Sequence, residues 1–329
     1  MRYDFSFDEV LSEHAYDRPL VVDGVRCHGG FVGERYVSPR TLVRSDAIAA
    51  WQSRLPAGEI SAVLDPITAR IPPHFPNAAQ TRLLVREGVT MPLVRILSLI
   101  AIVEGFGGEV LRTVPVPPLR ERVREPIDGT ALAHLGPLFE AHARDEAGHR
   151  LMWELARDIA LDRPEIPKDL AGARPPSSTP RLLTEIPADL EALLLRMLGV
   201  LTIEVFAMGA FRWARAVLGD DSLFPRHAEA TAVVGYIQHD ETPHVGYLAT
   251  VLAELRCRTL VGSDGTAVSG RDVVDRARDM IVAFQTGPAH AANVEFRTKV
   301  IERYTAEHPR REAILEHFRS LGTAAALSA

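Results

Sequence analysis

Two segments of this chain place a glutamate three residues before a histidine. HARDEAGHR contains Glu146 and His149, and HDETPHVGY contains Glu241 and His244. Positions i and i+3 of an α-helix share a face, so each pair presents a carboxylate oxygen and an imidazole nitrogen in one direction. Carboxylate-rich sites with two histidines favour iron or manganese over copper. A chain with 12 histidines can contain one such pair by chance, so a single pair is weak evidence for a metal site. The interpretation depends on whether other ligand residues accompany each pair.

Each pair follows a segment with a lone glutamate in an apolar run. LSLIAIVEGFGG contains Glu104 and LGVLTIEVFAMG contains Glu204, and aligning the two runs puts these glutamates in register. A buried carboxylate is costly unless it is paired or bound to a metal, and no lysine or arginine lies within a turn of either one. The order Glu, Glu-x-x-His therefore occurs twice and predicts a site for two divalent cations. The alternative is that Glu104 faces solvent, or that Glu109, which lacks the register match, is the functional residue.

The spacing of apolar residues predicts helices nearly throughout the chain from residue 78 on. A proline-rich segment, 163–181, divides the central part into two helical pairs. That order is the connectivity of a four-helix bundle with one long crossover. The four long helices are expected at about 91–113, 129–161, 187–218 and 226–256.

The flanking segments predict additions to this bundle. Short strands or an irregular arm are expected within residues 1–37, then a helix after Ser38-Pro39 at about 40–55, and two or three helices between 270 and 321. The tail 323–329 is expected to fray. The corresponding domain division is an N-terminal arm (1–77), the helical bundle (78–256) and a C-terminal helical extension (257–329).

Composition narrows the class of protein. Hydrophobic residues make up 47% and charged residues 24% of 329, which is typical of a globular chain. A net charge of −6 without a basic block argues against nucleic acid as a partner. The chain has only two cysteines, Cys27 and Cys257, which are far apart and form no Cys-x-x-Cys motif, so a disulfide framework is not expected. The polar N-terminus does not resemble a signal peptide, and the longest apolar run, 96–103, is too short to span a membrane. A cytoplasmic location without membrane contact is expected.

The repeated order of four glutamates and two histidines resembles the ferritin-like di-iron carboxylate proteins. That group includes ribonucleotide reductase small subunits, bacterial multicomponent monooxygenases, acyl-carrier-protein desaturases, rubrerythrins and the arylamine N-oxygenases, and the resemblance covers about residues 90–256. It implies an all-α, ferritin-like four-helix bundle whose carboxylates and histidines hold two iron ions. Glu146 and Glu241 would be the bridging ligands. The implied ligands are Glu104, Glu146 and His149 for one ion, and Glu204, Glu241 and His244 for the other.

The same resemblance suggests roles for three further residues. An aspartate before the paired glutamate commonly accepts the free N–H of a ligand histidine on the facing helix, which would make Asp145 and Asp240 such partners; otherwise they are ordinary exposed charges. His142 lies on the stripe of Glu146 and could be a seventh ligand, a proton donor or a packed core histidine. The arylamine N-oxygenases also use a third histidine, but on the helix of the other pair. The four glutamates and His142 are the candidate catalytic groups.

Other residues depart from the common pattern. Pro243 inside the second pair predicts a local bulge or kink, unless the helix simply tolerates it. Trp153 occupies the place where ribonucleotide reductase subunits carry a radical tyrosine, which argues against a tyrosyl radical there and favours a packed aromatic. Apolar side chains recur near the lone glutamates and either line a substrate cavity or belong to the core. They are Phe106, Phe206, Met208 and Phe211.

The resemblance implies an oxidoreductase: an O₂-activating, di-iron oxygenase or oxidase (monooxygenase type) acting on a small organic substrate. N-oxygenation, hydroxylation or desaturation are the expected reactions, and manganese could replace one iron. Electrons would come from a ferredoxin or reductase, since the chain lacks a nucleotide-binding glycine motif. A homodimer is compatible with this reading. The alternatives are a ferroxidase or other iron-handling protein, a ribonucleotide-reductase-like ligand-binding oxidase, or a metal-free helical scaffold.

Overall fold

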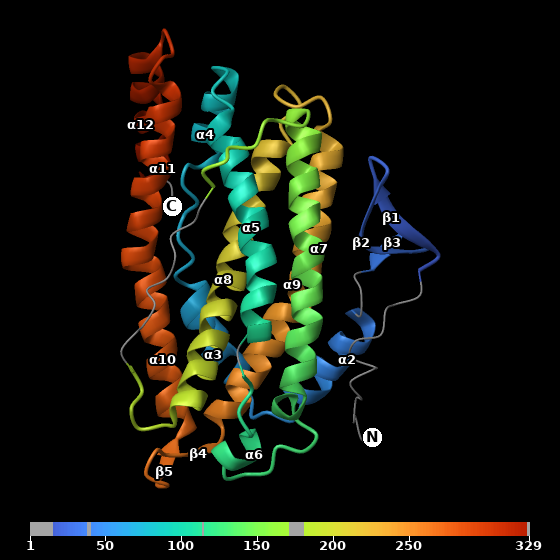
Figure 1. The fold of residues 1–329 in the computed structure, drawn as a ribbon, viewed down its shortest axis with the longest axis vertical. Coiled ribbons are helices and arrows are strands. Elements are labelled where there is room, and N and C mark those ends of the chain that lie inside the picture. Colours follow the sequence, from blue (N-terminus) through green and yellow to red (C-terminus); the bar gives the residue numbers. More distant parts are fainter. Residues whose placement is uncertain (1–15, 38–40, 114, 171–180, 328–329) are drawn as a thin grey trace.

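The computed structural model of the chain describes residues 16–37, 41–113, 115–170 and 181–327 (Figure 1). The described residues are mostly helical, with a few short strands. Long helices run parallel to the long axis of the molecule, and the small N-terminal sheet lies at one side. The mostly helical expectation is therefore confirmed.

Four helices are the longest elements around the interior. Helix α7 packs against both α5 and α9, and α9 packs against α8. Leucine, isoleucine and valine side chains from these helices fill the interior, and their burial stabilises the arrangement because apolar surface leaves water. The bounds follow the predicted ranges closely. They are α5 Met91–Thr113, α7 Leu135–Leu161, α8 Ala188–Leu218 and α9 His227–Arg256.

The N-terminal part adds a sheet and three helices. Strands β1 (Arg18–Val22), β2 (Val25–Val32) and β3 (Arg35–Val37) form an antiparallel sheet, and β2 lies against α7. This confirms the predicted N-terminal strands. Helices α2 and α3 pack on α9, whereas α4 packs on α8. Their bounds are α2 Thr41–Gln52, α3 Glu59–Thr68 and α4 Ala78–Arg86.

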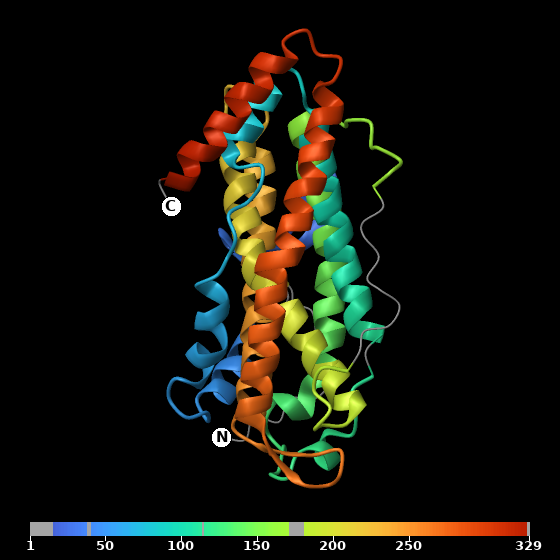
Figure 2. The same cartoon turned by 90° about the vertical axis from the view of Figure 1, so that its left-hand side faces the viewer.

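The C-terminal part crosses the long helices. Helix α10 packs on α8 and α9, and α11 lies against α5, so the pair passes from one helix to the other (Figure 2). A π-helical turn joins α10 to α11, and α12 returns to α4. The bounds are α10 Gly270–Phe284, η2 Gln285–Ala289, α11 His290–Thr305 and α12 Arg311–Leu327.

Three short elements complete the fold, and the sequence pattern missed them. A two-stranded hairpin of β4 (Thr259–Val261) and β5 (Ala267–Ser269) follows α9. Helix α6 (Leu119–Arg122) and the 3₁₀ helix η1 (Ala131–His134) lie between α5 and α7. Because η1 occupies the first turn of the range predicted for α7, the long helix begins at Leu135.

One local expectation is wrong, and at Pro243 the second of two alternatives, a tolerated proline, agrees with the structure. The tail does not fray from residue 323, because α12 stays helical to Leu327; residues 328–329 lie outside the described part. Helix α9 continues without interruption through Pro243, so a bulge is absent there. The π-helical turn lies in η2 instead, at another proline, Pro288.

Helix α8 is long and apolar enough to cross a membrane by length and composition alone. Half of its most apolar window, 50%, is buried inside the protein. That burial fits a core helix, because the same apolar side chains that would face lipid already contact other helices.

Glu254 in the last turn of α9 caps the N-terminus of η1, the 3₁₀ helix that precedes α7. Its buried carboxylate accepts the backbone N–H groups of Ala131 at 3.0 Å and Leu132 at 2.9 Å, the first residues of η1. The first N–H groups of a helix have no partner within that helix, so an external acceptor satisfies them.

Glu254→Ala should lower the free energy of unfolding by about 2–4 kcal/mol, because it leaves two buried N–H groups without an acceptor. Urea unfolding of both proteins measures this difference. Glu154→Ala is the control: its exposed pair with Arg150 contributes about 0–1 kcal/mol. Equal midpoints for Glu254→Ala and the wild type would contradict the capping role.

Candidate metal centre

The two Glu-x-x-His pairs meet in the interior, where α7 and α9 pack together. Glu146 and His149 come from α7, and Glu241 and His244 come from α9; none of the four is more than 2% exposed. His149 Nδ1 lies 3.0 Å from Glu241 Oε1, and His244 Nδ1 lies 2.8 Å from Glu241 Oε2. His244 Nδ1 is also 3.2 Å from Glu146 Oε1. The sequence repeat thus becomes one spatial cluster.

The donor atoms form two overlapping groups that could each hold a metal ion. Within each group the atoms lie within 4.8 Å of one another. Glu146 and His244 belong to both groups, so the two sets of donors are adjacent. The first group is His142, Glu146, Glu204 and His244, and the second is Glu146, His149, Glu241 and His244.

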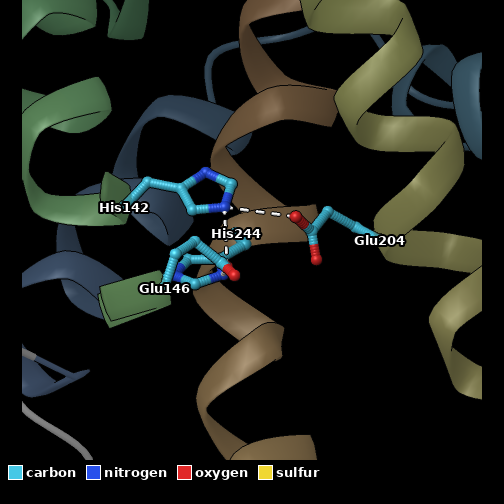
Figure 3. Close-up of side chains that lie close together, drawn as sticks. All are labelled: His142, Glu146, Glu204 and His244. Carbon is cyan, nitrogen blue, oxygen red and sulfur yellow. Dashed lines mark hydrogen bonds and ion pairs between the residues drawn. The ribbon is translucent and has the colours of Figure 1, made fainter. Parts of the chain in front are cut away.

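His142 points into the cluster (Figure 3). Its Nε2 lies 3.1 Å from Glu146 Oε1 and 3.2 Å from Glu204 Oε1. Its Nδ1 is 2.8 Å from the hydroxyl of Tyr247 on α9. His142 is fully buried and hydrogen-bonded, as a core histidine would be, and its partners are the carboxylates of the candidate site.

Glu204 reaches the cluster from α8, and Glu104 approaches it from α5. Glu204 is 7% exposed and contacts His142. Glu104 lies outside the two tight groups of the described residues, but its carboxylate shares a hydrogen bond with Glu146 and accepts the indole N–H of Trp153 at 3.1 Å. Glu104 therefore belongs to the same polar interior.

Trp153 is a packed aromatic residue, as predicted from the sequence, and it also donates a hydrogen bond to Glu104. It is buried at 1% exposure and stacks on Phe211, with ring centroids 5.5 Å apart. Its hydrogen bond to Glu104 fixes the direction of that carboxylate. Of the other apolar residues near the lone glutamates, Phe106 is 57% exposed, whereas Phe206 and Met208 are half-buried.

The two aspartates contact the histidines of the facing helix. Asp145 of α7 lies 3.1 Å from His244 Nε2, and Asp240 of α9 lies 3.4 Å from His149 Nε2. Both are buried, at 0% and 1% exposure, which rules out ordinary exposed helix charges. Each imidazole thus turns Nδ1 toward the glutamates and Nε2 toward an aspartate, and such a contact fixes ring orientation.

The N-terminal arm supplies partners for these aspartates. Arg44 of α2 forms an ion pair with Asp145 at 2.6 Å, and both side chains are buried. The Tyr36 hydroxyl of β3 donates to the Asp240 carboxylate at 3.1 Å. These two contacts, and that of Tyr247 with His142, could not be predicted from the sequence, because no spacing rule links residues of different elements.

The charges of the cluster divide its carboxylates into two kinds. Burial, then the charges of Glu241 and Glu146, raise the pKa of Glu204 to about 7 and that of Glu104 well above its ordinary value. Burial also opposes ionisation of Glu146 and Glu241, but the histidines outweigh it. The pKa of Glu146 is held well below its ordinary value and that of Glu241 at about 2.

The histidines respond to the same charges in the opposite direction. Burial lowers the pKa of His149 and His244, but Glu241, then the aspartates and Glu146, raise it well above the ordinary value. Protons thus compensate the buried carboxylates in the metal-free protein. Divalent cations would do the same with two charges each, and buried charges are otherwise retained only when paired.

One contact in the cluster supports the fit of these donor atoms to a divalent metal ion. Glu241 Oε1 is buried and has no hydrogen-bond partner among the described residues. His149 Nδ1 lies 3.0 Å away, so one metal ion could bind both atoms. Carboxylate oxygens with imidazole nitrogens suit iron, manganese or zinc.

Comparison with protein-family models, with curated proteins and with solved structures finds no match to this chain. The functional assignment therefore depends on the geometry of the site and on the sequence repeat.

Metal affinity should fall as pH decreases through about 7. Binding requires ionised carboxylates, and Glu204, whose raised pKa is about 7, retains its proton below that pH. Each pH unit below 7 should cost about tenfold in apparent affinity from this group. Anaerobic Fe²⁺ titrations between pH 6 and 8 measure the slope.

Glu204→Gln is the matched variant, because it cannot release this proton. It should bind Fe²⁺ more weakly, with a shallower dependence on pH below 7. An unchanged slope in Glu204→Gln would assign the proton to another group.

Proposed function

We propose that this chain is a ferritin-like, non-haem di-iron oxygenase or oxidase that acts on a small organic substrate. The carrying observation is the pair of adjacent, buried donor groups that share Glu146 and His244. Three long helices supply these donors: α7 gives Glu146 and two histidines, α9 gives Glu241 and His244, and α8 gives Glu204. Glu104 of α5 lies beside them, hydrogen-bonded to Glu146. With Glu104 included, the glutamates and the two Glu-x-x-His pairs match the ligand distribution of di-metal carboxylate proteins with a four-helix core.

The residues fit two metal positions. His149 and Glu241 would hold one ion, and His142 with Glu204 would hold the other; Glu146 and His244 face both. His142 would then be a third nitrogen donor. Glu104, oriented by Trp153, is placed to join the ligands once a cation replaces its proton. Iron in both positions is our proposal, and manganese in one is compatible with the same donors.

Bound at these residues, two reduced metal ions would supply the redox chemistry for O₂ reduction. The protein residues supply control of protons and water. Glu204, with a pKa of about 7, exchanges its proton near neutral pH in the metal-free protein, so a bound cation would displace that proton. The Tyr247 hydroxyl at His142 Nδ1 fixes the ring and keeps Nε2 toward the carboxylates.

An organic substrate is part of the proposal because of the resemblance to di-iron oxygenases. Phe206 and Met208, which follow Glu204 on α8, pack against the apolar core, and Phe106, which follows Glu104 on α5, is exposed. N-oxygenation, hydroxylation and desaturation are the candidate reactions, with electrons supplied by a ferredoxin or reductase.

Glu204→Ala and Glu104→Ala should each lose at least half of the bound iron after anaerobic reconstitution, measured by elemental analysis. Helicity by circular dichroism should remain, because the replaced side chains do not fill the apolar core. Glu302→Ala on the exposed face of α11 is the control and should retain wild-type iron. Full metal content in both variants would refute the assignment.

A ferroxidase is the second candidate, because Glu104 is partly exposed and could meet iron that arrives from the surface. Oxygen uptake separates the two functions. An oxygenase supplied with a reductant consumes O₂ repeatedly and faster when an amine or carboxylic acid substrate is present. Uptake that stays proportional to added Fe²⁺, with every organic compound without effect, would favour the ferroxidase.

A further inference from the structure

An open pocket of about 630 Å³ lies outside the metal cluster, where strand β3 meets the end of α8 and the first turns of α9. It is separate from the two donor groups, since none of its lining residues belongs to them. The side chains used below are Tyr36, Arg215, His227, Gly235, Tyr236 and His239.

One wall of the pocket is aromatic. The rings of Tyr36 and Tyr236 lie 4.4 Å apart with an angle of 33° between their planes. Phe31 supports Tyr236 edge-on at 6.0 Å, and His239 meets Tyr36 edge-on at 5.6 Å. Another planar ring can stack on the outer face of a partly exposed ring in this tilted, supported pair.

The rest of the lining favours an anion. It contains Arg215, His227 and His239 and no carboxylate. Arg215 is exposed, and its hydrogen bond is to the side-chain oxygen of Gln238 at 3.4 Å, a neutral partner. Nδ1 of His227 is buried and without a hydrogen-bond partner among the described residues. His227 also begins the 30-residue helix α9, whose N-terminus adds partial positive charge.

The pocket is connected to the metal cluster through one wall residue. Tyr36 lines the pocket and donates its hydroxyl to Asp240, whose other neighbour is His149 Nε2 at 3.4 Å. A ligand in the pocket is therefore separated from the cluster by these three side chains. It would contact the outer partner of a candidate ligand histidine without reaching the metal itself.

We propose that this pocket binds a planar aromatic carboxylate, stacked on Tyr36 and Tyr236 with its anionic group toward Arg215 and His227. We propose further that, through Tyr36 and Asp240, the bound molecule changes the metal affinity of the cluster. The second statement rests on the proposed di-metal function, whereas the first does not. The ligand is thus an effector of the centre and is distinct from the molecule oxidised there.

Calorimetric titration of 1-naphthoate into the metal-free full-length chain tests the binding site. Saturable binding of one molecule per chain is expected. Cyclohexanecarboxylate, which lacks the ring system, and 1-naphthalenemethanol, which lacks the charge, should each bind at least tenfold more weakly. Arg215→Ala should weaken naphthoate binding about tenfold, the effect of losing one charge-assisted contact.

Gly235→Leu is the decisive variant. A Cβ at Gly235 meets no atom within 4 Å, and leucine favours a helix over glycine, so the variant should fold and fill the pocket. It should abolish naphthoate binding. Gly199→Leu on α8, where a Cβ also meets nothing within 4 Å, is the matched control and should bind as the wild type does.

Tyr36→Phe tests the connection. It keeps the ring and removes the hydroxyl that contacts Asp240, so naphthoate should still bind. Saturating naphthoate should change the Mn²⁺ affinity of the wild type at least threefold and leave that of Tyr36→Phe unchanged. An equal change in both proteins, or none in the wild type, would overturn the connection.

The outcomes separate this proposal from the di-metal function. Absence of saturable naphthoate binding, or binding that survives Gly235→Leu, overturns the pocket assignment whatever the metal content. Binding lost in Glu204→Ala but retained in Gly235→Leu would place the aromatic anion at the metal cluster and also overturn it. A chain that binds naphthoate but no metal would leave the pocket intact and refute the proposed function.

Discussion

The main constraint on this structure is that several carboxylates are buried among long apolar helices, where their charge must be compensated. Glu146, Glu204 and Glu241 lie almost entirely out of water, and no lysine or arginine contacts them among the described residues. Their charge is compensated by histidines and by protons in the metal-free protein. This compensation is costly, because charged groups lose hydration energy on burial. The donor atoms of this cluster, which come from α7, α8 and α9, are of the kind that could hold a metal ion.

The N-terminal arm and the C-terminal helices act on this interior in different ways. Residues of the arm contact the aspartates behind the two histidines, so β3 and α2 help to orient the cluster from its outer side. The C-terminal helices α10 and α11 pass over α8 and α5, the two helices that carry the lone glutamates. The cluster is thus enclosed by segments that are remote in sequence, and its exposure depends on how these segments pack.

The sequence predicted the parts of the molecule that follow local periodicity. The long helices and the two Glu-x-x-His pairs obey the helical repeat, and the register of Glu104 with Glu204 indicated a shared site. The partners that come from other elements could not be predicted in the same way. Tyr36 and Arg44 sit in segments with no pattern that points to α7 or α9, and the position of His142 between two carboxylates depends on how α7 is rotated. At Pro243 the local rule left two alternatives open, a bulge or a tolerated proline, and the α-helix continues through it.

The aspartates behind the histidines are equivalent in sequence but not in environment. Asp145 is paired with the cation of Arg44, whereas Asp240 receives the neutral hydroxyl of Tyr36. A carboxylate that also pairs with a guanidinium is a weaker hydrogen-bond acceptor for the N–H of the imidazole beside it. His244 and His149 are therefore unequal donors, and the duplicated half-sites are electronically asymmetric. Two ions held by this repeat would differ in reduction potential, although the sequence that holds them is nearly the same.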